Sequence, residues 1–250
     1  MSAPAIVFGL HAVRTLLQRT GNRVRRICVD ARRDDPRMRE VLQLAQQLGL
    51  KPERVDAKVL AGWLGNVAHQ GVMLEVEPLA PWHEDELVAA IATAKDPLVL
   101  VLDGVQDPHN LGACLRTADA CGALAVVVPK DRAASINATV RKVAAGAAET
   151  LPLATVTNLA RTLKLLKEAG QWIVGADMQG EQLAWTADLT GSRALVMGGE
   201  GDGLRELTRK SCDYLVRLPQ AGSVESLNVS VACGMLLYES LRQRSQSPAH

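Results

Sequence analysis

The chain has 250 residues, enough for one large domain or two small ones. It is 48% hydrophobic but only 3% aromatic, so its core must be mainly aliphatic, and its net charge of +1 indicates no particular partner. Residues 1–76 nevertheless hold 12 Lys and Arg against 7 Asp and Glu, whereas the remainder holds 16 against 20. The first part is therefore the better candidate to bind a polyanion, although a solvated, arginine-rich surface explains this charge equally well.

Cysteine usage and hydropathy narrow the class of protein. Five cysteines, an odd number with no C-x-x-C spacing, argue against a structural zinc or a disulfide framework and predict reduced thiols in a cytoplasmic protein without metal. The first residues lack a basic leader before a long apolar core, so we expect no signal peptide. No apolar run approaches the roughly 20 residues of a membrane span, so we expect no membrane association.

Residues 1–77 alternate in pattern and predict a small α/β domain. "VFGLHAVRTLLQR" predicts a helix, "RRICVD" a strand, "RMREVLQLAQQLG" a second helix that ends at Gly49, and "HQGVMLEVEP" a closing strand. "PLAPWH" holds two prolines and is the best candidate for a linker. We therefore expect a linker with a possible helix over residues 78–95.

Residues 96–246 predict a second, larger domain. The apolar runs "LVLVLD", "LAVVVP", "WIVGAD" and "ALVMGG" alternate with helix-patterned segments, and "DYLVRLP" leads into a final helix from Ser226 to about Arg244. Such runs are typical of parallel strands that are covered on both faces. This alternation predicts an α/β fold whose ligands bind beyond the carboxyl ends of the strands. We expect residues 247–250 to form a disordered tail.

The first polar loop is "LDGVQDPHNLGACLRTADACG", which follows a predicted strand. Its apolar residues recur at the spacing of one helix face. Asn110 stands where a helix N-cap is expected, and Arg116 lies off the apolar face. An ordinary cap followed by a surface arginine explains this loop alone about as well as a functional site.

The second loop, "VMGGEGDGLREL", places four glycines in six positions after a strand. Glycine lets the backbone approach a ligand closely. The loop is neither a Walker sequence nor G-x-G-x-x-G, because Leu204 stands where the third glycine belongs. Glu200 lies inside it, and the alternative interpretation is a plain turn with an incidental acid.

The third loop and helix read "LPQAGSVESLNVSVACGMLLYESL". Ser226 is a good N-cap and Asn228 lies in the first predicted turn, although both can serve as caps only. Residues 229–238 are apolar almost all round, so the helix must be buried by its sheet or by a second subunit. No Ser-His-Asp or Cys-His constellation accompanies these loops.

Together the three loops resemble the three motifs of the SpoU (TrmH-like) RNA ribose 2′-O-methyltransferases of the SPOUT class, over about residues 96–244. With "VFGLHAV" and "HQGV", the whole chain is most similar to members that methylate a guanosine of bacterial 23S ribosomal RNA. Its first part resembles their RNA-binding domain. The alternatives are a tRNA ribose methyltransferase or a non-enzymatic RNA-binding module. A nicotinamide or nucleotide enzyme is disfavoured because its glycine-rich sequences are missing.

The resemblance implies a deep trefoil knot at the carboxyl end, a homodimer formed through the knotted domain, and S-adenosylmethionine as cofactor. By the same resemblance, the cofactor is held by Met197, Gly198, Gly199, Gly201, Leu218, Leu227 and Asn228. The implied catalytic residues are Arg116, Asn110, Glu200, Ser226 and Asn228. A guanidinium stays protonated at neutral pH, so we expect Arg116 to align the substrate rather than remove a proton. The predicted RNA-binding residues are Arg25, Arg26, Arg32 and Arg33.

Overall fold

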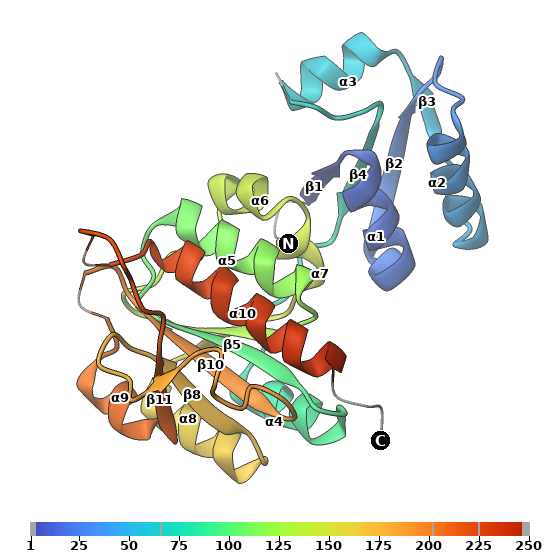
Figure 1. The fold of residues 1–250 in the computed structure, drawn as a ribbon. Coiled ribbons are helices and arrows are strands. Elements are labelled where there is room, and N and C mark those ends of the chain that lie inside the picture. Colours follow the sequence, from blue (N-terminus) through green and yellow to red (C-terminus); the bar gives the residue numbers. More distant parts are fainter. Residues whose placement is uncertain (1–3, 66, 202, 225, 247–250) are drawn as a thin grey trace. The chain divides into compact units, whose positions relative to one another are not determined.

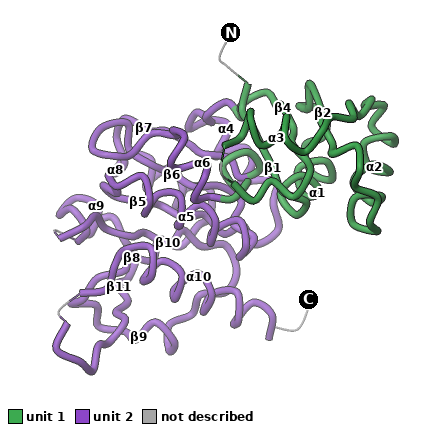
Figure 2. Tube along the Cα trace, turned by 90° about the horizontal axis from the view of Figure 1, so that it is seen from above, with its two compact units in different colours: residues 1–79, 145–150 green, residues 80–144, 151–250 purple. Residues whose placement is uncertain are grey.

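The computed structural model describes residues 4–65, 67–201, 203–224 and 226–246. The chain forms two compact units, coloured separately in Figure 2. The first comprises Met1–Leu79 with Ala145–Thr150, and the second comprises Ala80–Ala144 with Leu151–His250. Within the described ranges, no helix is long and apolar enough to cross a membrane. The predicted tail, residues 247–250, lies outside these ranges.

The first unit is a four-stranded sheet, in the order β1-β4-β2-β3, with helices packed against it. β4 pairs antiparallel with both β1 and β2, and β2 pairs parallel with β3. Its elements are β1 Ala5–Phe8, α1 Leu10–Thr20, the 3-10 turn Gly21–Arg23, β2 Val24–Asp30, α2 Pro36–Gln47, β3 Glu53–Val55, α3 Ala57–Leu64, β4 Val72–Val76 and α7 Ala147–Thr150. The prediction of one helix beginning at Val7 was wrong, because Val7 and Phe8 belong to β1 and a turn at Gly9, with φ of 87°, separates them from α1.

The second unit is a seven-stranded sheet in the order β7-β6-β5-β10-β8-β11-β9, and every neighbouring pair is parallel. This confirms the predicted α/β class. The elements are α4 Glu84–Thr93, β5 Leu98–Asp103, α5 Pro108–Ala120, β6 Ala125–Pro129, α6 Ala138–Ala144, β7 Leu153–Val156, α8 Leu159–Glu168, β8 Trp172–Ala176, β9 Gln182–Leu183, β10 Arg193–Gly198, α9 Glu206–Ser211, β11 Tyr214–Arg217 and α10 Val229–Gln246. Because β10 lies between β5 and β8, the strand order does not follow the chain.

Helices cover both faces of this sheet, and in Figure 1 α5 and α10 lie side by side on one of them. α4 and α8 pack on the other face, where Leu87 and Leu163 meet the strand residues Val99 and Val101 in one buried cluster. The central strands are buried throughout, since all six residues of β5 are inaccessible to solvent. A core closed on both faces leaves the ends of the strands as the places where a ligand can enter.

Candidate functional site

The candidate site lies where β5 and β10 end. These strands run in register, with Asp103 opposite Gly198, so both chains leave the sheet at the same level. The next two strands in the chain, β6 and β7, lie to one side of β5, and β10 and β8 lie to the other. A reversal of strand order of this kind opens a crevice at the carboxyl ends of a parallel sheet.

The glycine-rich loop after β10 folds tightly back on itself. A Cβ built on Gly198 would lie 2.2 Å from the Gly203 carbonyl carbon, and one on Gly199 would lie 2.7 Å from the Gly104 oxygen. The buried carboxylate of Asp103 holds the end of the loop, since Oδ2 accepts from the Arg205 backbone N–H at 3.1 Å and Oδ1 binds the Arg205 guanidinium. The close packing therefore requires glycine at both positions.

The first motif forms the start of α5, with a cap that differs from the prediction. Asp107, not Asn110, is the N-cap, and its carboxylate accepts from the backbone N–H groups of His109 and Asn110 at 3.2 Å each. Pro108 fits the first helical position because it has no N–H to satisfy, so the helix begins two residues before Asn110. The Asn110 side chain is 9% exposed and is free to bind other groups.

The third motif begins its helix later than predicted. α10 starts at Val229 rather than at Ser226, and Asn228 provides the cap. The Asn228 Oδ1 atom accepts from the Ser230 backbone N–H at 2.9 Å and from the Ser230 hydroxyl at 2.6 Å. Ser226 therefore lies in the loop before the helix, where it lines the cavity described below.

A chain of hydrogen bonds joins the three motifs. Asn228 Nδ2 donates to Asn110 Oδ1 at 3.0 Å, and Asn110 Nδ2 donates to Glu200 Oε1. Each partner comes from a different strand–loop–helix segment, and the two asparagines are 118 residues apart in sequence. The chain fixes the orientation of the amides and directs one Glu200 oxygen toward Asn110, because an ionised carboxylate only accepts hydrogen bonds.

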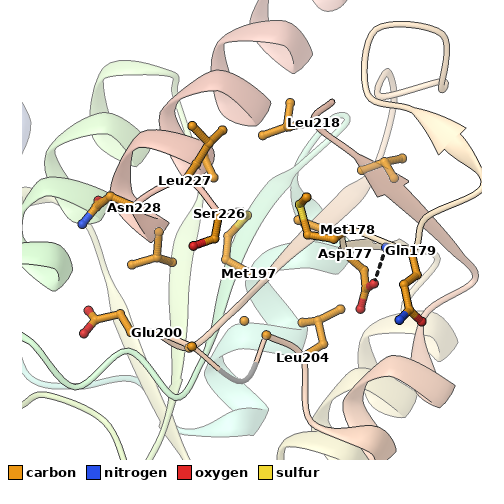
Figure 3. Close-up of a pocket in the computed structure, with 18 of the residues that line it drawn as sticks. Asp177, Met178, Gln179, Met197, Glu200, Leu204, Leu218, Ser226, Leu227 and Asn228 are labelled. Atoms are coloured by element: carbon orange, nitrogen blue, oxygen red, sulfur yellow. Dashed lines mark hydrogen bonds between the residues drawn. The ribbon is translucent and has the colours of Figure 1, made fainter. Parts of the chain in front are cut away.

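Next to this chain is a cavity of about 500 Å³. Figure 3 shows Glu200 and Asn228 at one side of it and Asp177 and Gln179 at the other, with the apolar side chains of Met197, Leu218 and Leu227 above and between them. All of the residues predicted to hold the cofactor line this one cavity: Met197, Gly198, Gly199, Gly201, Leu218, Leu227 and Asn228. Its size and its apolar wall with polar ends are those of a small-molecule site.

Sequence reasoning missed the segment that follows β8. Ala176, Asp177, Met178 and Gln179 also line the cavity. The Asp177 Oδ1 atom accepts from the Gln179 backbone N–H at 2.8 Å and from the Arg209 guanidinium at 2.7 Å, which orders this side. The strand "WIVGAD" was predicted, and the rule that ligands bind beyond strand ends could have identified its final aspartate.

Of the predicted site residues, Asn110, Arg116 and the four arginines of the first unit do not line the cavity, and Asn110 reaches its edge only through its hydrogen bonds to Glu200 and Asn228. Arg116 is exposed on α5, off the packed face as predicted, and has no side-chain partner within the described ranges. The four arginines of the first unit have acidic partners: Arg25 pairs with Glu77, Arg26 with Glu53 and Glu75, Arg32 with Asp56, and Arg33 with Asp35. The hydrogen bond from Arg26 lowers the pKa of the Glu53 carboxyl, and that from Arg33 lowers the pKa of the Asp35 carboxyl.

Thiols and metal ligands contribute little to the site. All five cysteines are free, and only Cys212 is not fully buried. Burial raises the pKa of Cys212 to about 12, so its thiol stays protonated at neutral pH and is a poor nucleophile. In the part of the chain that the structure describes, no cluster of three or more His, Cys, Asp or Glu could hold a metal ion.

Known proteins share both units. The model of the SpoU rRNA Methylase family matches residues 97–238, and a model described as RNA 2′-O ribose methyltransferase substrate binding matches residues 6–82. The 23S rRNA (guanosine-2′-O-)-methyltransferase RlmB of Pseudomonas putida is 51% identical, over 98% of each chain. The Escherichia coli protein of the same name is 46% identical, over 96% of this chain and 99% of the relative.

Solved structures agree with this relationship. The SpoU methyltransferase AviRb from Streptomyces viridochromogenes, in complex with the cofactor AdoMet, has a TM-score of 0.74 at 26% identity and covers 98% of this chain and 92% of its own. An AdoMet-bound rRNA methyltransferase from Sinorhizobium meliloti has a TM-score of 0.70 at 25% identity, with 95% and 86% covered. The predicted family is therefore confirmed, and the chain belongs to the SpoU rRNA methylase family.

Proposed function

We propose that the protein transfers a methyl group from S-adenosylmethionine to the ribose 2′-hydroxyl of a guanosine in 23S ribosomal RNA. The observation that carries this proposal is the convergence of the second and third loops on one cavity, with the Glu200–Asn110–Asn228 chain of hydrogen bonds joining the first loop to them. Full-length similarity to RlmB proteins supports the choice of RNA and of nucleotide. We include a cytoplasmic location in the proposal, because ribosomal RNA is the proposed substrate.

The residues around the cavity fit the cofactor. The close approach of the backbone at Gly198 and Gly199 leaves no side chain between a ligand and the loop, and Leu218 and Leu227 offer apolar surface to an adenine. The polar groups of Asp177 and Gln179 can bind hydroxyl or ammonium groups of the cofactor. S-adenosylmethionine supplies the methyl group as an electrophile on its sulfonium, and the protein supplies position and field.

The catalytic residues then divide into two groups. Asn228 holds Asn110, and Asn110 in turn donates to Glu200. The second carboxylate oxygen of Glu200 can accept a hydrogen bond from the ribose hydroxyl, and Ser226 also lies in the cavity lining. Arg116 is exposed and can bind an RNA phosphate through two parallel N–H groups. Together these contacts align the hydroxyl for displacement, a positioning effect that accounts for much of the rate in such reactions.

The first unit is proposed to bind the RNA. Arg25, Arg26, Arg32 and Arg33 lie in the segment that matches the substrate-binding model, and Arg32 is the most accessible of them, with its side chain 86% exposed. A ligand phosphate has to compete with the acidic partners of all four arginines. The proposed domain organisation is residues 1–77 for substrate binding, 78–95 as a linker that contains α4, and 96–246 for catalysis.

The fold and assembly of the family extend the proposal to a deep trefoil knot and a homodimer. Insertion of β10 between β5 and β8 and the packing of α10 on α5 are compatible with a chain that threads at its carboxyl end. α10 carries Val231, Met235 and Tyr238 on one face, with exposures of 48%, 49% and 67%. An apolar stripe at this helical spacing is typical of a subunit interface.

Mapping of 2′-O-methyl marks tests the proposed function. Transcripts of 23S rRNA and of tRNA are incubated separately with the protein and S-adenosylmethionine, and the marks are located by sequencing. We expect a single methylated guanosine in 23S rRNA. Methylation of tRNA instead would identify the alternative substrate, and RNA binding without any mark would identify a non-enzymatic module.

A further inference from the structure

The first unit contains a second cavity, of about 350 Å³, where α1 and α2 both begin. It is lined by Leu10, His11, Arg14, Arg37, Glu40, Val41 and Gln70. The residues come from the segments "FGLHAVR" and "HQGV" of the sequence and from α2. Its volume lies at the lower end of the range for small-molecule sites, roughly 300–1,000 Å³.

One cation of this cavity, Arg37, differs from the arginines described above in its side-chain partners. Arg37 is exposed and has no side-chain partner among the described residues, whereas Arg25, Arg26 and Arg33 are bound to carboxylates. Arg14 binds Glu40 at 3.2 Å, but its Nε atom is enclosed and has no hydrogen-bond partner within the described ranges. An enclosed atom cannot be reached from the cavity, so Arg37 is the arginine that the cavity offers to an incoming acceptor.

The turn that closes the cavity is held in place. Gln70 adopts φ of 53°, an uncommon value for a residue with a side chain. Its Oε1 atom accepts from the Leu10 backbone N–H at 2.9 Å, and its backbone carbonyl accepts from Arg33. With Oε1 engaged, the Nε2 group of Gln70 remains as the donor of this side chain. The polar groups are therefore in position before a ligand arrives.

We propose that this cavity binds one unpaired guanosine nucleotide of the substrate RNA, an inference that rests on RNA being the substrate. Arg37 and His11 meet the phosphate. A phosphate alone would be repelled by Glu40, so the occupant must also bring N–H donors. Guanine does so on its Watson–Crick edge, where two neighbouring N–H groups match the Glu40 carboxylate and O6 matches the Gln70 amide.

The test measures binding of two short, single-stranded, fluorescently labelled RNAs to the full chain without cofactor. One is all uridine, and the other has a single guanosine at its centre. We expect the guanosine to improve affinity about tenfold, the scale of one well-paired base. Glu40→Gln should abolish this preference. Arg37→Ala should weaken the binding of both RNAs and reduce the salt dependence of that binding, because one phosphate contact is lost.

Arg39→Ala is the matched control, because Arg39 is exposed on the same helix, is bound to Asp34 and does not line the cavity. It should leave both affinities within twofold of the unchanged protein. The inference would be overturned if the unchanged protein bound the two RNAs with equal affinity. It would also be overturned if Arg37→Ala and Arg39→Ala lost the same amount of RNA affinity. Since neither cofactor nor methyl transfer enters the measurement, a protein that binds guanosine but methylates no RNA would contradict the proposed function alone.

Discussion

Two side chains on α5 show how differently single residues are constrained in this site. Asn110 is almost buried, and its amide is bound on both sides, to Glu200 and to Asn228. Arg116 is six residues further along the helix, exposed and without a side-chain partner in the described part of the chain. The protein itself fixes the geometry of Asn110, whereas that of Arg116 is left to the substrate.

We predict that Arg116→Ala lowers the rate of methyl transfer about a hundredfold or more, the scale of losing one positioned catalytic group. Stability and cofactor affinity should stay nearly unchanged, because the side chain is exposed. Arg116→Lys should also lose most of the rate if the paired N–H groups are required, since lysine keeps only the charge. Single-turnover kinetics and calorimetry with cofactor provide the measurement. Near-normal turnover of Arg116→Ala would show that Arg116 is only a surface arginine without a role in methyl transfer.

Asn110→Ala should affect both stability and rate. The substitution removes the hydrogen bonds of Asn110 to Glu200 and Asn228, and each lost hydrogen bond costs about 0.5–1.5 kcal/mol. Asn137→Ala is the control, because Asn137 is exposed and accepts from the Val140 backbone N–H as a helix cap, which is worth about 1 kcal/mol. Denaturant titration should show a lower free energy of unfolding in both variants. If methyl transfer falls equally in both, the hydrogen-bond chain has no role of its own.

Among the elements, the loop after β10 has the least freedom to change. Gly198 packs against Gly203, and Asp103 of the neighbouring strand holds Arg205 at the far end. The described residues Gly198, Gly199 and Gly203 thus form a closely packed rim of the cofactor cavity. Any displacement of it also moves Glu200, which lies between these two fixed points.

Gly198→Ala should therefore remove cofactor binding. An added Cβ would overlap backbone atoms, which cannot turn aside as the end of a side chain can. The matched control is Gly222→Ala, because a Cβ at Gly222 meets no atom within 4 Å. Isothermal calorimetry with S-adenosylmethionine should give heat for the control and none for Gly198→Ala, while circular dichroism should show both folded. Equal affinities of the two variants for S-adenosylmethionine would mean that the loop can shift to accommodate the added Cβ.

The sequence predicted the buried strands well and the ends of helices poorly. β5, β6, β8 and β10 are apolar on both faces, so their runs stand out without knowledge of the fold. The short strands β7 and β9 carry too few residues to produce a pattern. The caps of α5 and α10 were misplaced because Asp, Asn and Ser all cap well, and only packing decides which of them does. Asp177 lines the cavity because β8 lies next to β10 in the sheet. This order of the strands cannot be read from a local sequence pattern.

For the molecule as a whole, the exposed apolar stripe on α10 is the feature from which we predict the oligomeric state. Leu236 and Leu237 face the core, while Val231, Met235 and Tyr238 remain accessible. A single chain would leave this apolar surface in water on the helix that Asn228 caps. Pairing with a second copy would cover the surface and hold the cap in place.

We predict that the protein is a dimer at micromolar concentration and that Met235→Asp makes it monomeric, because an unpaired charge is costly inside an interface. Leu207→Asp is the control, since Leu207 is 70% exposed on α9, away from the stripe. Light scattering should give two chains for the control and one for Met235→Asp. A single-chain mass for the unchanged protein would rule out the interface.

The hydrogen bond between Asn110 and Asn228 also has a consequence for synthesis. The partners are 118 residues apart, which at about 5–20 residues per second separates their translation by roughly 6–24 seconds. During that interval α5 and its sheet can fold, but Asn110 has no Asn228 to meet and the cavity lacks Leu218 and Leu227. A nascent chain halted before residue 228 should therefore not retain cofactor. The enzyme cannot become competent before residue 228 has been synthesised.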